Sequence, residues 1–265
     1  MRRNDGVRRR TLVIDIHTHL LPGVDDGSQS FETSASVLAR FALEGIRTVV
    51  CTPHLDASRA AEAPVAYYAE LLAALRSHLP AAGELRLLPG WEIKLDRPGC
   101  DLTSPDLSLG GSRAVLVEFP YGPLPTGANE EIARLCASDV VPVVAHPDRY
   151  HECNTSHVRA WRASGAVIQT DGRMLLGGGP HADFAHALVE EGLIDCLASD
   201  NHGDLRSVAT VRAWLTELGS GEAAELLTSE NPRRVLENER PLPVPSITIQ
   251  RGLLRRLRDL MFPST

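Results

Sequence analysis

Seven short runs of apolar, mostly β-branched residues constrain the fold of this chain more than any other feature. They fall at residues 11–17, 47–53, 85–93, 114–120, 140–146, 166–171 and 194–200. Apolar residues at helical spacing separate most of these runs, as in 31–44 and 64–79. Strands that alternate with helices predict a parallel sheet, and seven such units predict closure into a barrel. We therefore expect an α/β fold, a distorted seven-stranded β/α (TIM-like) barrel, in a single domain.

Glycines and prolines indicate where the elements end. Gly45, Gly165 and Gly192 each follow a helical stretch and precede an apolar run, as glycines that cap helix C-termini do. The character of the sequence changes near residue 238, where three prolines precede a segment rich in Arg and Leu. We expect a basic N-terminal extension at 1–10, the barrel at 11–238, and a Pro-rich linker with a basic amphipathic tail at 239–265.

Residues able to bind metal ions stand at the ends of six of the seven predicted strands. His17 and His19 end the first run, and their spacing places both imidazoles on one face of a strand. The other ends carry His54, Glu92, Glu118, His146, Asp200 and His202. Because the carboxyl ends of parallel barrel strands open onto one face, these side chains should converge there.

Such a ring of carboxylates would repel itself unless cations neutralised it, so the pattern predicts a metal site. The mixture of imidazole and carboxylate favours Mn, Fe, Zn or a similar ion over a structural zinc. The donors outnumber the ligands of a single ion, and two or three metals bridged by Glu92 fit their number. Clustered metals bind phosphate oxygens and lower the pKa of a bridging water.

Six motifs in order resemble one family. Residues 15–27 read DIHTHLLPGVDDG, and TPH, GWE, VEF, AHPDRY and ASDNH follow. This order resembles the PHP (polymerase and histidinol phosphatase) superfamily, and more closely its bacterial manganese-dependent protein-tyrosine phosphatases of capsule and exopolysaccharide operons. The likeness covers about residues 11–240. It implies a PHP barrel and hydrolysis of phosphotyrosine on an autophosphorylated tyrosine kinase, by attack of a metal-bridging hydroxide.

The resemblance also implies roles for individual residues. Arg149 matches the phosphate-binding arginine of the family, Arg206 is a candidate second clamp, and His54 or His202 could protonate the leaving group. The implied ligands of the three metals are His17, His19, Glu92 and Asp200 for the first, Glu92, Glu118 and His146 for the second, and Asp26, His54 and His202 for the third.

Four other hypotheses remain open at this stage. A cysteine phosphatase would use the C-x5-R spacing of Cys153 and Arg159, and an amidohydrolase would need Lys94, the only lysine, as a bridging ligand. A histidinol-phosphate phosphatase or another PHP phosphoesterase would keep the metals and change the pocket. A non-enzymatic kinase-binding module would keep the metals as structural ions.

Four aromatic residues lie next to the predicted ligands in the sequence: Trp91, Phe119, Tyr121 and Tyr150. They either flank a substrate ring or pack beneath the rim.

Composition limits the partners and the compartment. The net charge of −7 argues against a nucleic-acid-binding surface. Five scattered cysteines without a C-x-x-C motif, and the lack of a long apolar stretch, predict a cytoplasmic protein. Residues 250–262 place leucines at helical spacing among arginines, which suits a membrane surface, a kinase, the barrel itself or a second copy. The oligomeric state is not predicted.

Overall fold

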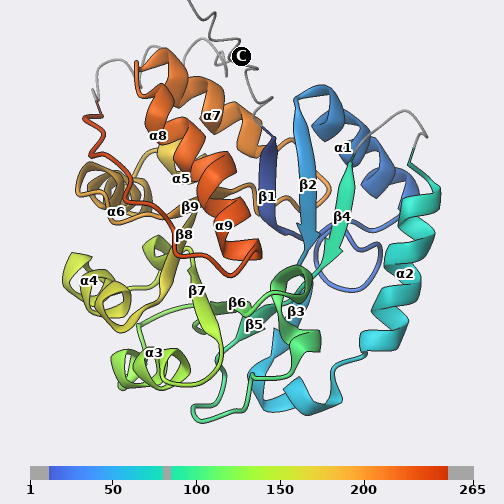
Figure 1. Ribbon diagram of the computed structural model, residues 1–265, viewed down its shortest axis with the longest axis horizontal. Coiled ribbons are helices and arrows are strands. Elements are labelled where there is room, and N and C mark those ends of the chain that lie inside the picture. Colours follow the sequence, from blue (N-terminus) through green and yellow to red (C-terminus); the bar gives the residue numbers. More distant parts are fainter. Residues whose placement is uncertain (1–11, 80–84, 250–265) are drawn as a thin grey trace, which may run out of the picture.

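A computed structural model describes residues 12–79 and 85–249 of the chain. Its strands are all parallel to their neighbours and form two sheets (Figure 1). The three-stranded sheet has the order β1 (Val13–Thr18), β2 (Ile46–Cys51) and β4 (Arg86–Pro89). The six-stranded sheet has the order β3 (His54–Asp56), β5 (Glu92–Lys94), β6 (Ala114–Glu118), β7 (Val141–Ala145), β8 (Val167–Asp171) and β9 (Cys196–Ala198).

The predicted α/β fold with parallel strands is confirmed, but no closed seven-stranded barrel is found among the described residues. Two of the seven apolar runs lead into a second strand after a break: β3 follows β2 just beyond the run 47–53, and the run 85–93 is divided between β4 and β5. Pro53 contributes to the first break, because proline has no N–H to donate to a ladder. The two sheets still meet beside β1, where Asp200 N–H donates to His17 O at 3.0 Å and His19 N–H donates to Asn201 O at 2.8 Å.

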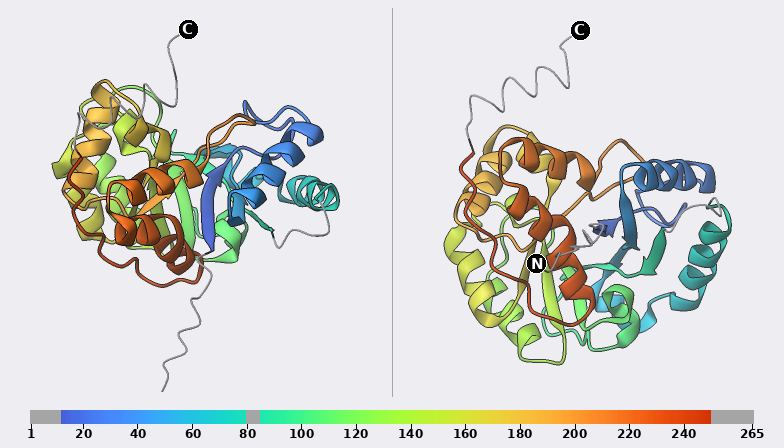
Figure 2. Two further views of the ribbon diagram at one scale, coloured as in Figure 1. Left: turned by 90° about the horizontal axis from the view of Figure 1, so that it is seen from above. Right: turned by 45° about the horizontal axis from the view of Figure 1, so that its top comes forward.

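Helices surround the strands, as Figure 2 shows. The predicted helices at 31–44 and 64–79 are confirmed as α1 (Phe31–Leu43) and α2 (Val65–Ser77). Gly45, Gly165 and Gly192 follow helices in the left-handed conformation, with φ of 91°, 111° and 65°. The further helices are α3 (Ala128–Cys136), α4 (Thr155–Ser164), α5 (Gly172–Leu176), α6 (Pro180–Glu190), α7 (Val208–Glu217), α8 (Gly221–Glu225) and α9 (Asn231–Leu236).

Short helical turns complete the connections. Four are 3₁₀ turns: η1 (Ala57–Glu62), η2 (Pro105–Leu107), η3 (Leu109–Gly111) and η4 (Pro147–Arg149). The segment η5 (Leu226–Glu230) is a π-helical turn that leads into α9. Because η4 follows β7 directly, it places residues at the same end of the sheet as the predicted ligands.

The strands are buried on both faces, which explains why they appear in the sequence as continuous apolar runs. In β6, Ala114 and Leu116 belong to a smaller cluster between the sheets, whereas Val115 and Val117 pack in the larger core beneath the helices. The alternation follows from the two-residue period of a strand. The smaller cluster fills the space that a barrel interior would occupy, and it leaves the carboxyl ends of the strands to polar residues.

The segment predicted as a linker packs on the body of the protein as far as residue 249. Val244, Ile247 and Ile249 are buried in the larger core, although 239–249 has no regular secondary structure. The predicted N-terminal extension at 1–10 and the tail at 250–262 lie outside the described residues. No helix of the described ranges is long and apolar enough to cross a bilayer.

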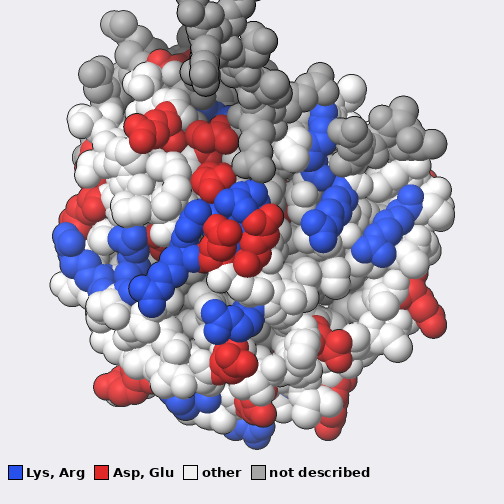
Figure 3. All heavy atoms as spheres, in the orientation of Figure 1, with Lys and Arg blue, Asp and Glu red and all other residues white. Residues whose placement is uncertain are grey.

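Charged side chains of both signs share the face drawn in Figure 3, where blue and red atoms lie next to one another around α9. Arg233 pairs with Glu230 at 2.7 Å and Arg234 pairs with Glu239 at 2.9 Å. Such pairing leaves this part of the surface without a wide basic patch of the kind that nucleic-acid-binding proteins present.

Gly27 lets the loop after β1 fold back onto His19. A Cβ at position 27 would lie 2.2 Å from the His19 carbonyl oxygen and 2.4 Å from the His19 Cβ. We therefore expect Gly27→Ala to lower the free energy of unfolding by about 1–3 kcal/mol, as overpacking does. Gly178→Ala is the control, because nothing lies within 4 Å of a Cβ there. Equal urea midpoints for the two variants would contradict this packing.

Candidate metal centre

The structure brings all nine predicted ligands together in one cluster where the two sheets meet. His17 lies in β1, Glu118 ends β6, and His146 follows β7. His54 and Glu92 begin β3 and β5 and are paired in register, so the breaks after β2 and β4 place both at the centre of the site. The remaining four, His19, Asp26, Asp200 and His202, lie in the loops after β1 and β9.

The first predicted set converges in the buried interior. His17 Nε2 and His19 Nε2 are 3.2 Å apart. Glu92 Oε2 lies 3.3 Å from the first nitrogen and 3.1 Å from the second. Asp200 Oδ1 lies 3.4 Å and 3.3 Å from the same two atoms. Four donor atoms therefore surround one point.

The opposite ring nitrogens show how these imidazoles are oriented. His17 Nδ1 lies 3.2 Å from Gln169 Oε1, and His19 Nδ1 lies 2.7 Å from Asp25 Oδ2. Both partners are acceptors, so each Nδ1 carries the proton when the ring is neutral, and each Nε2 then presents a lone pair. Two lone pairs at 3.2 Å cannot form a hydrogen bond, whereas a cation between them would bind both. The residues present thus fit a metal ion.

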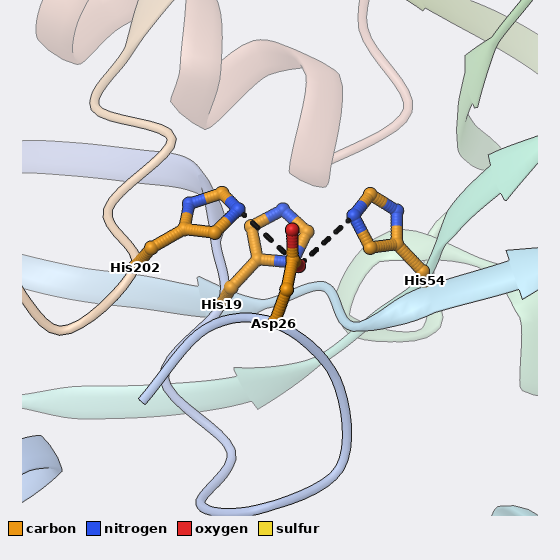
Figure 4. Close-up of side chains that lie close together, drawn as sticks. All are labelled: His19, Asp26, His54 and His202. Carbon is orange, nitrogen blue, oxygen red and sulfur yellow. Dashed lines mark ion pairs between the residues drawn. The ribbon is translucent and has the colours of Figure 1, made fainter. Parts of the chain in front are cut away.

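The third predicted set lies toward the surface and includes one further residue. Asp26 Oδ1 is 3.4 Å from His54 Nε2 and 3.5 Å from His202 Nε2, as the dashed lines of Figure 4 show. His19 joins these three, and one donor atom from each of the four lies within 4.8 Å of the others. The two imidazoles and the carboxylate of this third set suit a cation of their own, separate from the cation of the first set.

The second predicted set shares Glu92 with the first. Glu92 Oε1 is 2.7 Å from His146 Nε2, and Glu118 Oε2 is 3.9 Å from that nitrogen. His54 also approaches, with Nδ1 3.1 Å from Glu92 Oε2 and 3.5 Å from Glu118 Oε1. The two oxygens of Glu92 therefore face different neighbours, and this geometry suits the bridging role predicted for it.

In the absence of cations, protons hold this cluster together. Burial opposes protonation of His17, but the charges of Glu92 and Asp200 outweigh it and raise its pKa to about 9. Burial also opposes protonation of His54, and hydrogen bonds to Glu118 and Glu92 nevertheless raise its pKa to about 10. Metal ligands must be deprotonated, so a bound cation would take the place of these protons.

The two predicted arginines lie beside the same cluster. Arg149, at the end of η4, pairs with Asp171 and with Asp200. Arg206 Nη1 lies 3.2 Å from Asp200 Oδ2, and its Nε donates to Asp204 Oδ2 at 2.7 Å. Both guanidinium groups thus pair with Asp200, which is itself one of the predicted ligands.

Two of the predicted ligands have strained backbones. His146 has φ 34° and Asp200 has φ 50°, in the left-handed region that non-glycine residues seldom adopt. Each such residue costs on the order of 1–3 kcal/mol, and strain of this kind is concentrated at functional sites.

Sequence reasoning gave no role to Asp25, Gln169 or Asp171. Asp25 and Gln169 orient the two imidazoles, and Asp171 pairs with Arg149. The sequence contains a signal for each, because Asp25 precedes Asp26 and the other two lie among the last three residues of β8. The sequence does not show, however, which distant residues these side chains contact.

Three of the four rim aromatics pack beneath the site and do not face a substrate. Trp91, Phe119 and Tyr150 are buried, and the Tyr150 hydroxyl donates to Ala145 O at 2.9 Å. Tyr121 alone of the four is exposed, at 81%. Packing is thus the observed role of these three.

Two alternative chemistries lose support. Burial raises the pKa of Cys153 to about 12, and Arg159 of the same C-x5-R spacing pairs with Glu191, so no thiolate faces a phosphate-binding arginine. Lys94 Nζ lies 2.6 Å from Asp56 Oδ1, which raises the lysine pKa and keeps it charged instead of available as a metal bridge.

The comparisons with known proteins agree with this geometry. Residues 13–237 match the family model described as capsular polysaccharide synthesis, CpsB/CapC. The chain belongs to this family. The tyrosine-protein phosphatase YwqE of Bacillus subtilis is 31% identical over 235 residues, or 86% of this chain and 92% of that protein. The tyrosine-protein phosphatase CpsB of Streptococcus pneumoniae is 29% identical, over 86% of this chain and 99% of that protein.

A solved structure is similar as well. It comes from work on YwqE from Bacillus subtilis and CpsB from Streptococcus pneumoniae, described as metal-dependent tyrosine phosphatases. It matches with a TM-score of 0.72 at 29% identity, covering 90% of this chain and 100% of that chain. The family resemblance inferred from the motifs is therefore confirmed.

The hydrogen bond between Asp25 and His19 predicts a loss of metal affinity on mutation. We expect Asp25→Ala to weaken Mn²⁺ binding about 10–100-fold, because removing such an orienting partner has effects of this size. Asp25→Asn should lose less, since an amide oxygen still accepts from Nδ1–H. Asp101→Ala is a control at an exposed carboxylate away from the site. Unchanged affinity in calorimetric titration of Asp25→Ala would contradict this orienting role.

Proposed function

We propose that this protein is a metal-dependent phosphatase that hydrolyses phosphotyrosine in proteins. The observation that carries the proposal is the convergence of nine imidazole and carboxylate side chains with two arginines at one end of the fold. Membership of the CpsB/CapC family, with relatives named tyrosine-protein phosphatases, supports the same reaction.

We infer two or three divalent cations at this centre, with Mn²⁺ as the first choice and Fe or Zn as alternatives. Four carboxylates among the nine donors favour ions that accept oxygen together with imidazole. The ligand sets are those predicted from the sequence, and the proximity of His19 to Asp26, His54 and His202 supports adding it to the third. When bound, such cations polarise phosphoryl oxygens and allow water to ionise near neutral pH.

The protein's own residues would then bind and orient the phosphoryl group. The guanidinium groups of Arg149 and Arg206 offer paired N–H donors, a geometry that matches phosphate oxygens. Asp171 holds Arg149 from one side, so this arginine stays at the site while its other donors turn to the substrate. Arg206 contacts the same oxygen of Asp200 as Arg149 does and suits the role of a second clamp.

The leaving group needs little assistance from a proton donor of the protein. A phenol has a pKa near 10, so the phenolate of tyrosine needs less proton transfer than an alkoxide would. His54 and His202 stand at the open side of the cluster, with side chains 39% and 19% exposed. Whichever of the two rings binds no cation is placed to donate a proton to the departing oxygen.

The substrate that we infer is a tyrosine-phosphorylated protein of capsule or exopolysaccharide synthesis, in particular a bacterial tyrosine kinase that phosphorylates itself. The family description supports the pathway, and the motif resemblance supports the kinase. We propose the same cytoplasmic location for enzyme and substrate.

Hydrolysis assays on metal-stripped protein resupplied with Mn²⁺ test this function. We expect a phosphotyrosine peptide to be cleaved at least tenfold faster than a phosphoserine peptide or histidinol phosphate, and chelation to abolish the activity. Glu92→Gln should lose bound metal and activity together, because Glu92 contacts ligands of both the first and the second predicted set. Preference for histidinol phosphate would contradict the assigned substrate, and activity that survives chelation would contradict the metal centre.

A further inference from the structure

A cavity of about 570 Å³ lies beside the metal centre, between the segments that follow β8 and β9. Arg173 and Leu176 of α5 form one wall, and Leu205, Arg206 and Thr210 form the other. Apolar atoms make up most of its surface. The volume is that of a small-molecule site, although none of the nine predicted ligands lines it.

The cavity is continuous with the phosphate-binding side of the site. Arg206 lines it and also places Nη1 3.2 Å from Asp200 Oδ2. Ser199, a further lining residue, directly precedes Asp200. A group bound in the cavity would therefore be separated from the reacting phosphate by about the length of one arginine side chain.

Hydrogen bonds fix the wall that carries Leu205. Arg40 Nη2 donates to Asp204 O at 2.7 Å, and Asn201 Nδ2 donates to Arg206 O at 2.6 Å. Between these anchors the Leu205 side chain is 85% exposed. A leucine held outward on an anchored loop offers apolar contact to a partner without the entropy cost of ordering the loop.

The cavity also has an unneutralised charge. Arg173 is exposed, and within the ranges 12–79 and 85–249 it forms no ion pair. Arg206 differs, because Asp200 and Asp204 both pair with it. A ligand of this cavity would thus meet apolar surface and one free cation.

We propose that this cavity binds the polypeptide that flanks the phosphotyrosine, with an apolar side chain inside it and an acidic residue beside Arg173. This inference rests on the proposed phosphotyrosine phosphatase function. Residues one or two positions from the phosphotyrosine lie about 4–7 Å away along an extended chain, so they stay near the site when the phosphate is bound. The apolar surface and the free guanidinium select for this chemistry.

Peptide kinetics on the full-length Mn²⁺-loaded enzyme test the proposal. Three phosphotyrosine peptides of equal length would be compared with phenyl phosphate. The first has leucines directly on both sides of the phosphotyrosine and aspartates beyond them, the second replaces the aspartates with lysines, and the third has glycine and serine at these positions. We expect the first to exceed the third in kcat/KM by about tenfold, equivalent to about 1.4 kcal/mol.

Two variants then separate the charge from the apolar contact. Arg173→Glu should make the lysine peptide the better substrate, and Leu205→Ala should reduce the advantage of both leucine peptides three- to tenfold relative to phenyl phosphate. Arg113→Glu and Leu12→Ala are matched controls at exposed positions before β6 and β1, at the other end of the strands, and should keep the wild-type ratios.

The possible outcomes are distinguishable. If phenyl phosphate is hydrolysed but Arg173→Glu and Leu205→Ala keep the wild-type peptide ratios, the proposed subsite is wrong and the proposed function stands. If Leu205→Ala changes the sedimentation of the protein and leaves those ratios unchanged, a second copy occupies the cavity and the proposal is overturned. If the wild-type enzyme cleaves no phosphotyrosine peptide, the proposed function fails and this inference fails with it.

Discussion

The convergence of two imidazole lone pairs on one buried point is the constraint on which the rest of the site depends. His17 and His19 can face each other at 3.2 Å only because acceptors behind them, Gln169 and Asp25, hold the opposite ring nitrogens. The carboxylates of Glu92 and Asp200 complete the arrangement. Such a polar centre inside a protein requires positive charge, supplied either by protons or by cations.

The fold satisfies this constraint by bringing metal-binding side chains from both sheets together in one cluster. The breaks after β2 and β4 place His54 and Glu92 at the start of β3 and β5, in the middle of the cluster and not at its edge. Backbone hydrogen bonds between β1 and the segment after β9 hold His17 and Asp200 together. The left-handed backbones of His146 and Asp200 indicate that packing enforces the positions of the donors.

The sequence predicted the parallel α/β fold, helices α1 and α2 and the end of the sheet where the donors gather, because strand and helix periods and strand-end residues are local signals. It did not predict two separate sheets, because the breaks at Pro53 and Gly90 depend on how neighbouring strands pack. It also gave no role to Asp25 and Gln169, whose importance lies in contacts with His19 and His17 across the fold. The cavity beside Arg206 arises from two loops distant in sequence, so no motif indicated it.

Proton release on metal binding tests the central claim most directly. The pKa of His17 is raised to about 9 and that of His54 to about 10 without cations, so both rings hold protons at pH 7.5. Cations must displace these protons, and metal affinity should therefore rise with pH. Calorimetric titration of the stripped protein with Mn²⁺ in buffers of different ionisation enthalpy should show two or three ions and more than one proton released per chain. Binding without proton release, or no binding, would contradict the account.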